Sequence, residues 1–159
     1  MTIKSLPTYI FSLSESPGSV LAKNHVVIHN PTGSGKVMFL SAFFGSHVAL
    51  ATSVLTAPLR GLRCSGTPSG GLLEEAAATC KFIPAHPDPT AQVFTGNPTV
   101  TLGAPFLNSP ASVDKRTSAV HGVDAPLPFA ITPRNGVVFR QEAFSVDISW
   151  NISVIWRES

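Results

Sequence analysis

Alternating apolar and polar side chains near the end of the chain constrain its fold more than any other feature. In FSVDISWNISVIW, residues 144–156, all seven even-numbered positions are apolar, and all odd-numbered positions except Ile155 are polar. Successive side chains of a β-strand point to opposite faces, so this period of two predicts a long strand with one buried face. In a helix the same side chains would be scattered around the circumference.

Shorter runs rich in β-branched and aromatic residues predict further strands, each bounded by glycine, proline or asparagine. These runs are HVVIHN (25–30), VMFLSAFF (37–44), TAQVFT (90–95), TVTLG (99–103) and GVVFRQ (136–141). The run at 37–44 is apolar on both of its faces, which predicts a strand in the centre of a sheet. Short strands separated by turn residues are typical of antiparallel sandwiches and barrels.

Proline and glycine limit the room for helices, because 14 prolines and 12 glycines are spread along the whole chain. One stretch, residues 70–82, has acidic residues near its start and Lys81 near its end, which suits the helix dipole. It predicts a single helical turn, although a strand could equally begin at Thr79. Residues 108–128 are polar and rich in turn residues, and they predict a long loop. We therefore expect an all-β protein, a single antiparallel β-sandwich that is jelly-roll-like and has at most one short helix.

The length of 159 residues fits one domain, with residues 1–18 forming an N-terminal arm or first strand and residues 19–159 forming the β-sandwich. Apolar residues gather ahead of the segment SESPG, and they are the candidate interface residues: Pro7, Tyr9, Ile10, Phe11 and Leu13. Two interpretations stay open, since such a segment could pair within this domain or lie on a neighbouring subunit.

The sequence GSGK at 33–36 raises the question of a phosphate-binding loop. Such a loop needs a glycine five positions before the Gly-Lys pair, and a serine or threonine directly after the lysine to hold Mg²⁺. Asn30 and Val37 occupy those two positions. A turn between two strands is the better interpretation, with Pro31 ending the first strand and the glycines supplying positive φ values.

Residues 37–59 contain no Lys, Arg, Asp or Glu, and about 20 apolar residues are enough to cross a bilayer. Serine, threonine, glycine and proline interrupt this stretch, and strands buried on both faces also read as continuous apolar runs. We therefore expect two buried strands broken near Gly45 and Ser46 rather than a membrane helix, and no membrane as a partner.

Charged residues make up only 13% of the chain, about half of the usual share of about 25%. Interface cores are depleted of charge, so this composition is typical of a surface partly covered by partners or by copies of the same chain. A neutral surface rich in serine and threonine would give the same composition. The 11 basic residues are scattered singly and the net charge is +2, so nucleic acid is not expected as a partner.

The two cysteines, Cys64 and Cys80, are too few for a disulfide scaffold and lack the spacing of a metal site. They predict two free thiols in a protein made in a reducing cytoplasm. No apolar segment of signal-peptide length precedes Pro7, and this does not favour secretion.

No combination of residues in the sequence indicates catalysis. His25 and His29 would face the same side of a strand, but no carboxylate or cysteine nearby completes a metal site. The serines lack the glycine pattern of a nucleophile elbow, and the adjacent Glu74 and Glu75 are explained more simply as a feature of a helix start. We expect no enzyme activity, no cofactor and no bound metal.

Trp150 and Trp156 fall in the apolar register of the last strand, which predicts burial in a core or an interface with each indole N–H bonded. The alternative is an exposed aromatic platform on which a carbohydrate stacks. The core is the simpler interpretation of this pattern.

A series of turn-and-strand motifs begins with IHNPTGSGKVMFL (28–40), an Asn-Pro pair and a glycine-rich turn followed by an apolar strand. SGG (69–71), ATCKFIPAHPDPTAQV (78–93), ITPRNGVVFRQ (131–141) and the closing Trp-Arg-Glu (156–158) follow in order. In this order the motifs resemble those of a group of small structural proteins of tailed bacteriophages. The resemblance implies a β-rich virion component that decorates the head.

On this basis we expect a structural virion protein, located on the capsid surface and made in the host cytoplasm. The function expected first is that of a capsid decoration (cement) protein, which binds the major capsid protein or other virion proteins and stabilises the head shell by bridging subunits. It would form a homo-oligomer, and a trimer would match the three-fold positions of a shell. A tail, connector or fibre-associated protein is one alternative, and a carbohydrate-binding β-sandwich module is another.

Overall fold

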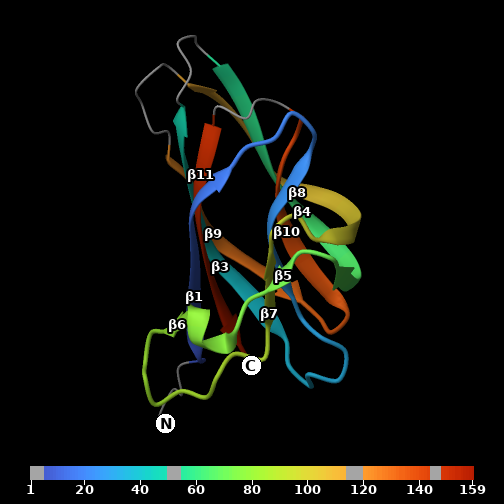
Figure 1. The fold of residues 1–159 in the computed structure, drawn as a ribbon. Helices are drawn as coiled ribbons and strands as arrows, with labels where there is room; N and C mark the ends of the chain where they lie inside the picture. The colour runs from blue at the N-terminus through green and yellow to red at the C-terminus, as the bar shows by residue number, and fades with distance from the viewer. Residues whose placement is uncertain (1–5, 50–54, 114–119, 144–147) are drawn as a thin grey trace.

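The computed structural model describes residues 6–49, 55–113, 120–143 and 148–159, which form two antiparallel β-sheets packed together (Figure 1). Sheet A has the strand order β6 (Thr79–Lys81), β1 (Thr8–Pro17), β11 (Ile148–Glu158), β3 (Met38–Ala49) and β9 (Val120–Ile131). Sheet B has the order β5 (Leu72–Leu73), β7 (Gln92–Thr95), β2 (Lys23–His29), β10 (Asn135–Gln141), β4 (Leu55–Ser69) and β8 (Thr99–Val113). The expected all-β antiparallel sandwich is confirmed.

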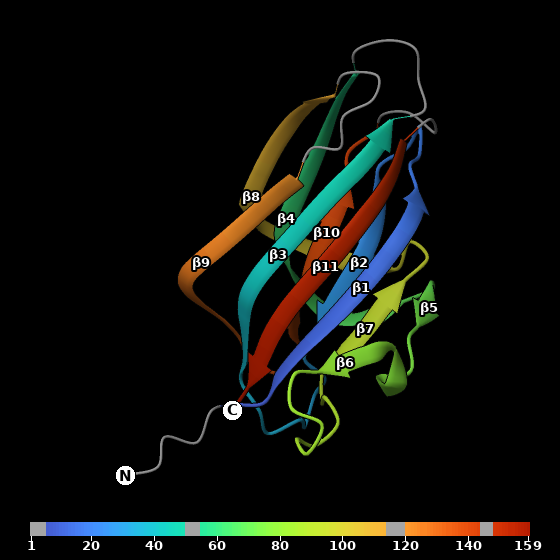
Figure 2. The same ribbon diagram turned by 90° about the vertical axis from the view of Figure 1, so that its left-hand side faces the viewer.

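The strand order is that of a jelly roll. Without the short strands β5, β6 and β7, sheet A runs β1-β11-β3-β9 and sheet B runs β2-β10-β4-β8. Among these eight strands the path crosses between the sheets after β1, β2 and β3, runs from β4 to β8 within sheet B, and crosses again after β8, β9 and β10. Between β4 and β8 the chain visits sheet A only at the short strand β6. A jelly roll is built from eight strands in two such sheets. Figure 2 shows β1, β11 and β3 side by side across the face of sheet A.

Strand β11 shows how the alternating sequence builds the core. Its even-numbered residues from Ile148 to Trp156 are fully buried, and the residues between them are half-buried on the outer face of sheet A. The predicted strand is confirmed from residue 148 onward, while residues 144–147 lie outside the described part of the chain. Across the core, the rings of Phe43 on β3 and Phe139 on β10 stack with their centroids 4.1 Å apart and join the two sheets.

Sheet B is buried on its outer face as well as on its inner face. Val27 and Val138 alternate with residues of the main core, so their side chains point away from sheet A. They belong to a second buried group, called here the outer cluster, whose members are Val27, Leu62, Cys64, Phe94 and Val138. Val100, near the start of β8, packs against this cluster.

The runs at 25–30, 90–95, 99–103 and 136–141 are confirmed as parts of β2, β7, β8 and β10. The run at 37–44 forms most of β3, but only one of its faces is buried. The strand lies inside sheet A between β11 and β9, as predicted, although Phe44 is 47% exposed on the outer face.

Residues 37–59 form two strands, as expected, but the break is not near Gly45 and Ser46. These residues pair with Ile152 and Asn151 in the middle of β3. Glycine fits there because a Cβ atom at position 45 would lie 2.9 Å from Cζ of Phe43. The boundary between β3 and β4 falls at residues 50–54, outside the described residues. In the described part of the chain, no helix is long and apolar enough to cross a membrane.

The long loop predicted at 108–128 is also wrong, because β8 extends to Val113 and β9 begins at Val120. Both are edge strands, and an edge strand tolerates proline and polar residues because one of its sides has no ladder to maintain. Residues 70–82 combine the two predicted outcomes. They contain one 3₁₀ turn at Ala76–Ala78, followed directly by β6.

Candidate functional site

The glycine-rich segment after β2 is a turn between two strands, as predicted. Gly33 and Gly35 have φ values of 80° and 64°. The buried Asn30 amide donates to the carbonyls of Lys36 and Ile131, both at 2.9 Å, and so holds the ends of the turn together. Oδ1 of Asn30 accepts a hydrogen bond from the Ser34 hydroxyl at 2.6 Å, so the side chain of Asn30 is bonded on both of its polar groups within this turn.

A β-bulge in β2 sends the two candidate histidines to different faces of sheet B. The pairing of β2 with β10 shifts beside Val26, which leaves His25 as the extra residue. The His25 ring lies 6.3 Å from that of Trp150 in the core, whereas the His29 ring lies 6.5 Å from that of Phe94 in the outer cluster. The prediction that both histidines face the same side is therefore wrong.

The surroundings of His25 keep it neutral. Its Nδ1 lies 2.8 Å from the Ser16 hydroxyl, and its Nε2 lies 3.2 Å from Oε1 of Gln141. Burial lowers the pKa of His25 to about 4, the bond to Gln141 opposes this shift, and the charge of Lys23 adds to it. The same Gln141 oxygen accepts a hydrogen bond from Trp150 Nε1 at 2.9 Å. The hydrogen bonds of Gln141 to His25 and Trp150 therefore connect β2, β10 and β11.

His29 is 1% exposed, and neither of its ring nitrogens has a hydrogen-bond partner among the described residues. Burial lowers its pKa, although the side chain of Gln92, opposite it on β7, favours the protonated form. No group of three His, Cys, Asp or Glu side chains comes together within the part of the chain that the structure describes. His29 is therefore a buried ring on the outer cluster without further ligands beside it.

The two cysteines lie in different sheets and are both free, as predicted. Cys64 is buried in the outer cluster, and burial raises its pKa to about 12. It is therefore a thiol at neutral pH and a poor nucleophile. Cys80 is exposed on β6, opposite Ile10 of β1.

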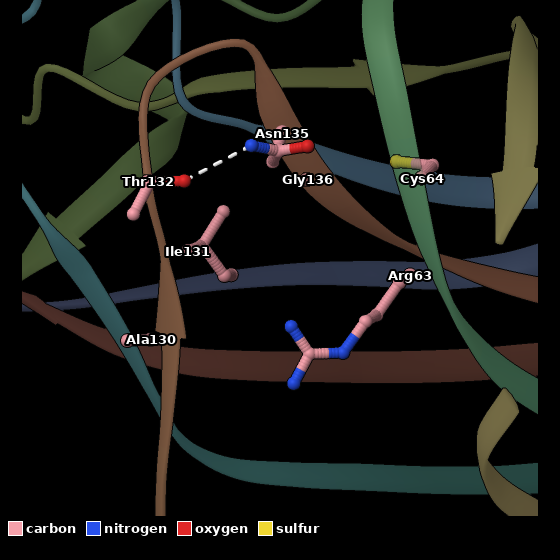
Figure 3. A pocket seen from close by; sticks show the side chains of 7 residues that line it. All are labelled: Arg63, Cys64, Ala130, Ile131, Thr132, Asn135 and Gly136. Carbon is pink, nitrogen blue, oxygen red and sulfur yellow. Dashed lines mark hydrogen bonds between the residues drawn. The ribbon is translucent and has the colours of Figure 1, made fainter. Parts of the chain in front are cut away.

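A pocket of about 160 Å³ lies between β4 and the segment that joins β9 to β10 (Figure 3). Its lining residues are Arg63, Cys64, Ala130, Ile131, Thr132, Asn135 and Gly136. The Asn135 amide donates to the Thr132 hydroxyl at 3.0 Å, so the polar groups of this wall bond to each other. With Cys64 held as a thiol and no carboxylate or histidine in the lining, the pocket has neither a nucleophile nor a general base.

The candidate interface residues near the N-terminus belong to a strand of this domain or lie just before it. Tyr9 and Phe11 are buried in the core and Leu13 packs against it, so these side chains are already occupied. Pro7 is half-buried just before β1. Ile10 points to the outer face of sheet A, where it lies opposite Ile155. Of the two interpretations, the structure gives the first strand.

A buried carboxylate at the end of β11 is a feature that the sequence patterns did not reveal. Glu158 is 1% exposed and accepts hydrogen bonds from the backbone N–H groups of Thr90 and Ala91 at 2.9–3.0 Å. The indole of Trp156 donates to the same carboxylate at 3.1 Å. In the sequence, Glu158 falls in the even-numbered register of β11 whose other residues are buried, and this position was the signal that could have predicted its burial. It fixes the segment before β7 to sheet A.

Both tryptophans are fully buried in the main core, as predicted, and each indole N–H is bonded. Neither ring can serve as a platform for a sugar. Apolar side chains that are exposed occur instead at the edge where β5 and β6 end the two sheets: Leu72, Leu73, Phe82 and Ile83. The sequence analysis placed Leu72, Leu73 and Phe82 in the helix-like stretch 70–82 and singled out none of the four as exposed apolar residues.

No family model, curated protein or solved structure matches this chain. The strand order is therefore the feature on which a functional argument rests, because all eight strands of a jelly roll are present. The residues on the described surfaces then decide which of the functions found on such a fold is favoured.

Proposed function

We propose that this protein is a structural component of a virus particle, a capsid decoration protein that binds the head shell and stabilises it by bridging subunits. The observation that supports this most is the strand order, since jelly rolls recur in viral capsid proteins, lectins and cupins. A fold does not by itself fix a function, and the residues on the fold have to select among these classes.

The described residues favour a structural function over a reaction. The pocket beside β4 holds no nucleophile or base, and the described histidines and cysteines are dispersed or sealed in the protein interior. They also favour it over carbohydrate binding, because both tryptophans are core residues. A low content of charge, 13%, suits surfaces that are covered by other subunits.

A decoration protein would act by mass action. If it binds the assembled shell and not the separate subunits, it stabilises the shell as any ligand does that is selective for one state. Many equivalent copies add avidity without requiring a strong single contact. A rigid sandwich with its edge loops anchored by buried bonds, as at Glu158, loses little conformational entropy when it binds.

A second candidate is that the chain forms the shell itself. The complete eight-strand order favours it, because jelly rolls build capsid shells. A tail, connector or fibre-associated position and a carbohydrate-binding module are further alternatives.

The test is the copy number of this protein in purified particles from its source, measured by quantitative mass spectrometry. Comparable copies beside a separate major shell protein are expected for decoration. Comparable copies without any other major shell protein would assign the shell to this chain. A handful of copies would move it to the tail or neck, and absence from particles would overturn the proposal.

A further inference from the structure

The pocket between β4 and the segment that joins β9 to β10 has a cationic side chain but no carboxylate in its lining. Arg63 is exposed on β4, and Figure 3 shows its guanidinium group extending from that strand toward Ile131 and Ala130 on the opposite wall. A guanidinium group has five N–H donors in a planar fork, so it can hold a bound anion in addition to contacts within the protein. The pocket is therefore suited to an anionic group.

The hydroxyl of Thr132 adds a second donor to the pocket. Its oxygen accepts a hydrogen bond from the Asn135 amide at 3.0 Å, so its own proton points elsewhere. The Asn135 amide also donates to the carbonyl of Pro133 at 3.2 Å, which fixes the amide with both of its hydrogens engaged. Because Thr132 is exposed, its hydroxyl proton can be donated to a bound acceptor.

The surroundings of the pocket are positive. Arg134 is exposed in the same turn, directly before Asn135, and among the described residues it forms no ion pair. Arg63 and Arg134 thus bring two positive charges to the pocket and its rim, and the lining has no acidic side chain to offset them. Their field would draw an anion toward the opening, and added salt would weaken this attraction.

The size of the pocket and the apolar part of its lining favour a carboxylate on a short stem. A cavity of about 150 Å³ holds a benzene molecule, so a pocket of about 160 Å³ has room for the side chain of an aspartate or glutamate. Ala130 and Ile131 offer apolar contact to the methylene groups of such a side chain, and the guanidinium fork matches the geometry of a carboxylate. A nucleic acid would need several phosphate contacts, for which two arginines are too few.

We propose that this pocket binds one carboxylate, presented by a partner protein as an aspartate or glutamate side chain and held by Arg63 and Thr132. The inference deepens the proposed function by naming the chemistry through which the protein recognises its partner in the particle, and it rests on that function for the identity of the partner. The carboxylate itself can be supplied as a small molecule. The test on the isolated protein can therefore fail while the copy-number result stands, and the reverse also holds.

The first experiment is an NMR titration of the isolated protein with N-acetylglutamate N-methylamide, a glutamate residue with both backbone ends blocked. We expect saturable shifts of the backbone amides of Cys64, Asn135 and Gly136 with a Kd on the order of 1 mM, since so small a ligand makes few contacts. The glutamine counterpart should bind at least about tenfold more weakly, because it lacks the charge. Equal binding of the two compounds, tighter binding of inorganic phosphate, or no saturable shift would overturn the proposal.

Substitutions test the two donors. Arg63→Gln should weaken binding at least about tenfold, because the cation that pairs with the carboxylate is removed. Arg60→Gln is the matched control, since Arg60 lies on the same strand and is paired with Glu142 at 3.3 Å. Thr132→Val removes the hydroxyl with little change of shape and should weaken binding about fivefold. Equal losses in Arg63→Gln and Arg60→Gln would show a general effect of charge and contradict the site.

Thermal unfolding followed by circular dichroism checks that these variants are folded. If Arg63→Gln does not fold, the comparison of Thr132→Val with Arg60→Gln decides the question, and equal affinities of these two variants would contradict the site.

Binding to particles stripped of this protein tests the source of the carboxylate. Arg63→Gln should bind such particles more weakly than Arg60→Gln does. Particle binding that Arg63→Gln leaves unchanged, beside a positive titration, would assign the pocket to a free carboxylate compound and overturn the part of the proposal that concerns a partner protein.

Discussion

The two sheets of the sandwich differ in how many of their faces are covered. Sheet A buries only its inner face, and the residues of β11 alternate strictly between core and surface. Sheet B buries both faces, and six consecutive residues of β2 are buried. Strict alternation in the sequence marks β11 as a half-buried strand. Double burial is not marked in the same way, because β2 contains buried polar residues, whereas the apolar run at 37–44 leaves Phe44 exposed.

The outer faces of the two sheets differ in the same way. The outer cluster on sheet B is buried by the protein's own side chains, whereas the outer residues of β11 on sheet A are only half-buried.

The largest expected effect comes from placing a carboxylate on the outer face of each sheet. Val138→Asp should destabilise the protein by about 3–5 kcal/mol, because a charge would be left unpaired in the buried outer cluster. Ile155→Asp, on the half-buried outer face of sheet A, should cost about 1 kcal/mol or less in dilute protein. Urea unfolding of both variants measures this, and equal losses would show that the two outer faces do not differ in burial.

Acid should weaken the protein through His25. The folded pKa of about 4 lies below the ordinary value of 6.5, so between these values the unfolded chain binds a proton that the folded chain excludes. The free energy of unfolding should therefore have its full value above pH 6.5, and it should fall by roughly 3 kcal/mol as the pH drops to about 4. The lowered pKa of His29 acts in the same direction.

Urea unfolding at a series of pH values measures this loss. His25→Gln should flatten the profile between pH 6.5 and 4, and His86→Gln, in the loop before β7, is the matched control. A profile that His25→Gln leaves unchanged would assign the acid sensitivity to other groups.

Loss of the buried carboxylate should have a smaller effect. Glu158→Gln replaces one acceptor oxygen by an NH₂ group that faces backbone donors, and a cost of about 2 kcal/mol is expected. Limited proteolysis should also cut the segment 82–91 faster, because its anchor to sheet A is weakened. An unchanged cleavage rate would show that the segment is held by other contacts, such as the bond from Tyr9 to the Pro87 carbonyl.

The smallest effect is expected on the outer face of sheet A itself. Ser12→Ala removes an exposed hydrogen bond to Ser153 and should change stability by no more than about 0.5 kcal/mol. Thermal unfolding in dilute protein measures it. A loss of several kcal/mol would mean that this face is a structural part of the fold, like the outer face of sheet B.

The sequence predicted those features that a short segment encodes by itself. The buried register of residues 148–156, the turn at 33–36 and the burial of both tryptophans are of this kind. Features that depend on distant pairing were missed. The bulge that turns His25 inward arises from the ladder with β10, and residues 108–113 and 120–128 belong to strands because β4 and β3 pair with β8 and β9.

The candidate interface shows the same limit. Apolar character at Tyr9, Ile10 and Phe11 was evident, but their division into inward and outward side chains follows from pairing with β11, more than 140 residues away. The row of Cys80, Ile10, Ile155 and Ala42 across sheet A combines residues from four strands, so no window of sequence contains it.

The position of β11 in the middle of sheet A, between β1 and β3, has a consequence for biosynthesis. Strand β11 leaves the ribosome after both of its neighbours, so sheet A cannot close until residues 148–158 have been made. Until then β1 and β3 present unpaired edges of the kind that promote aggregation. Contacts of such long sequence separation also make folding slow. A chain cut short before Ile148 would keep most of its residues and lose the strand that joins its two halves.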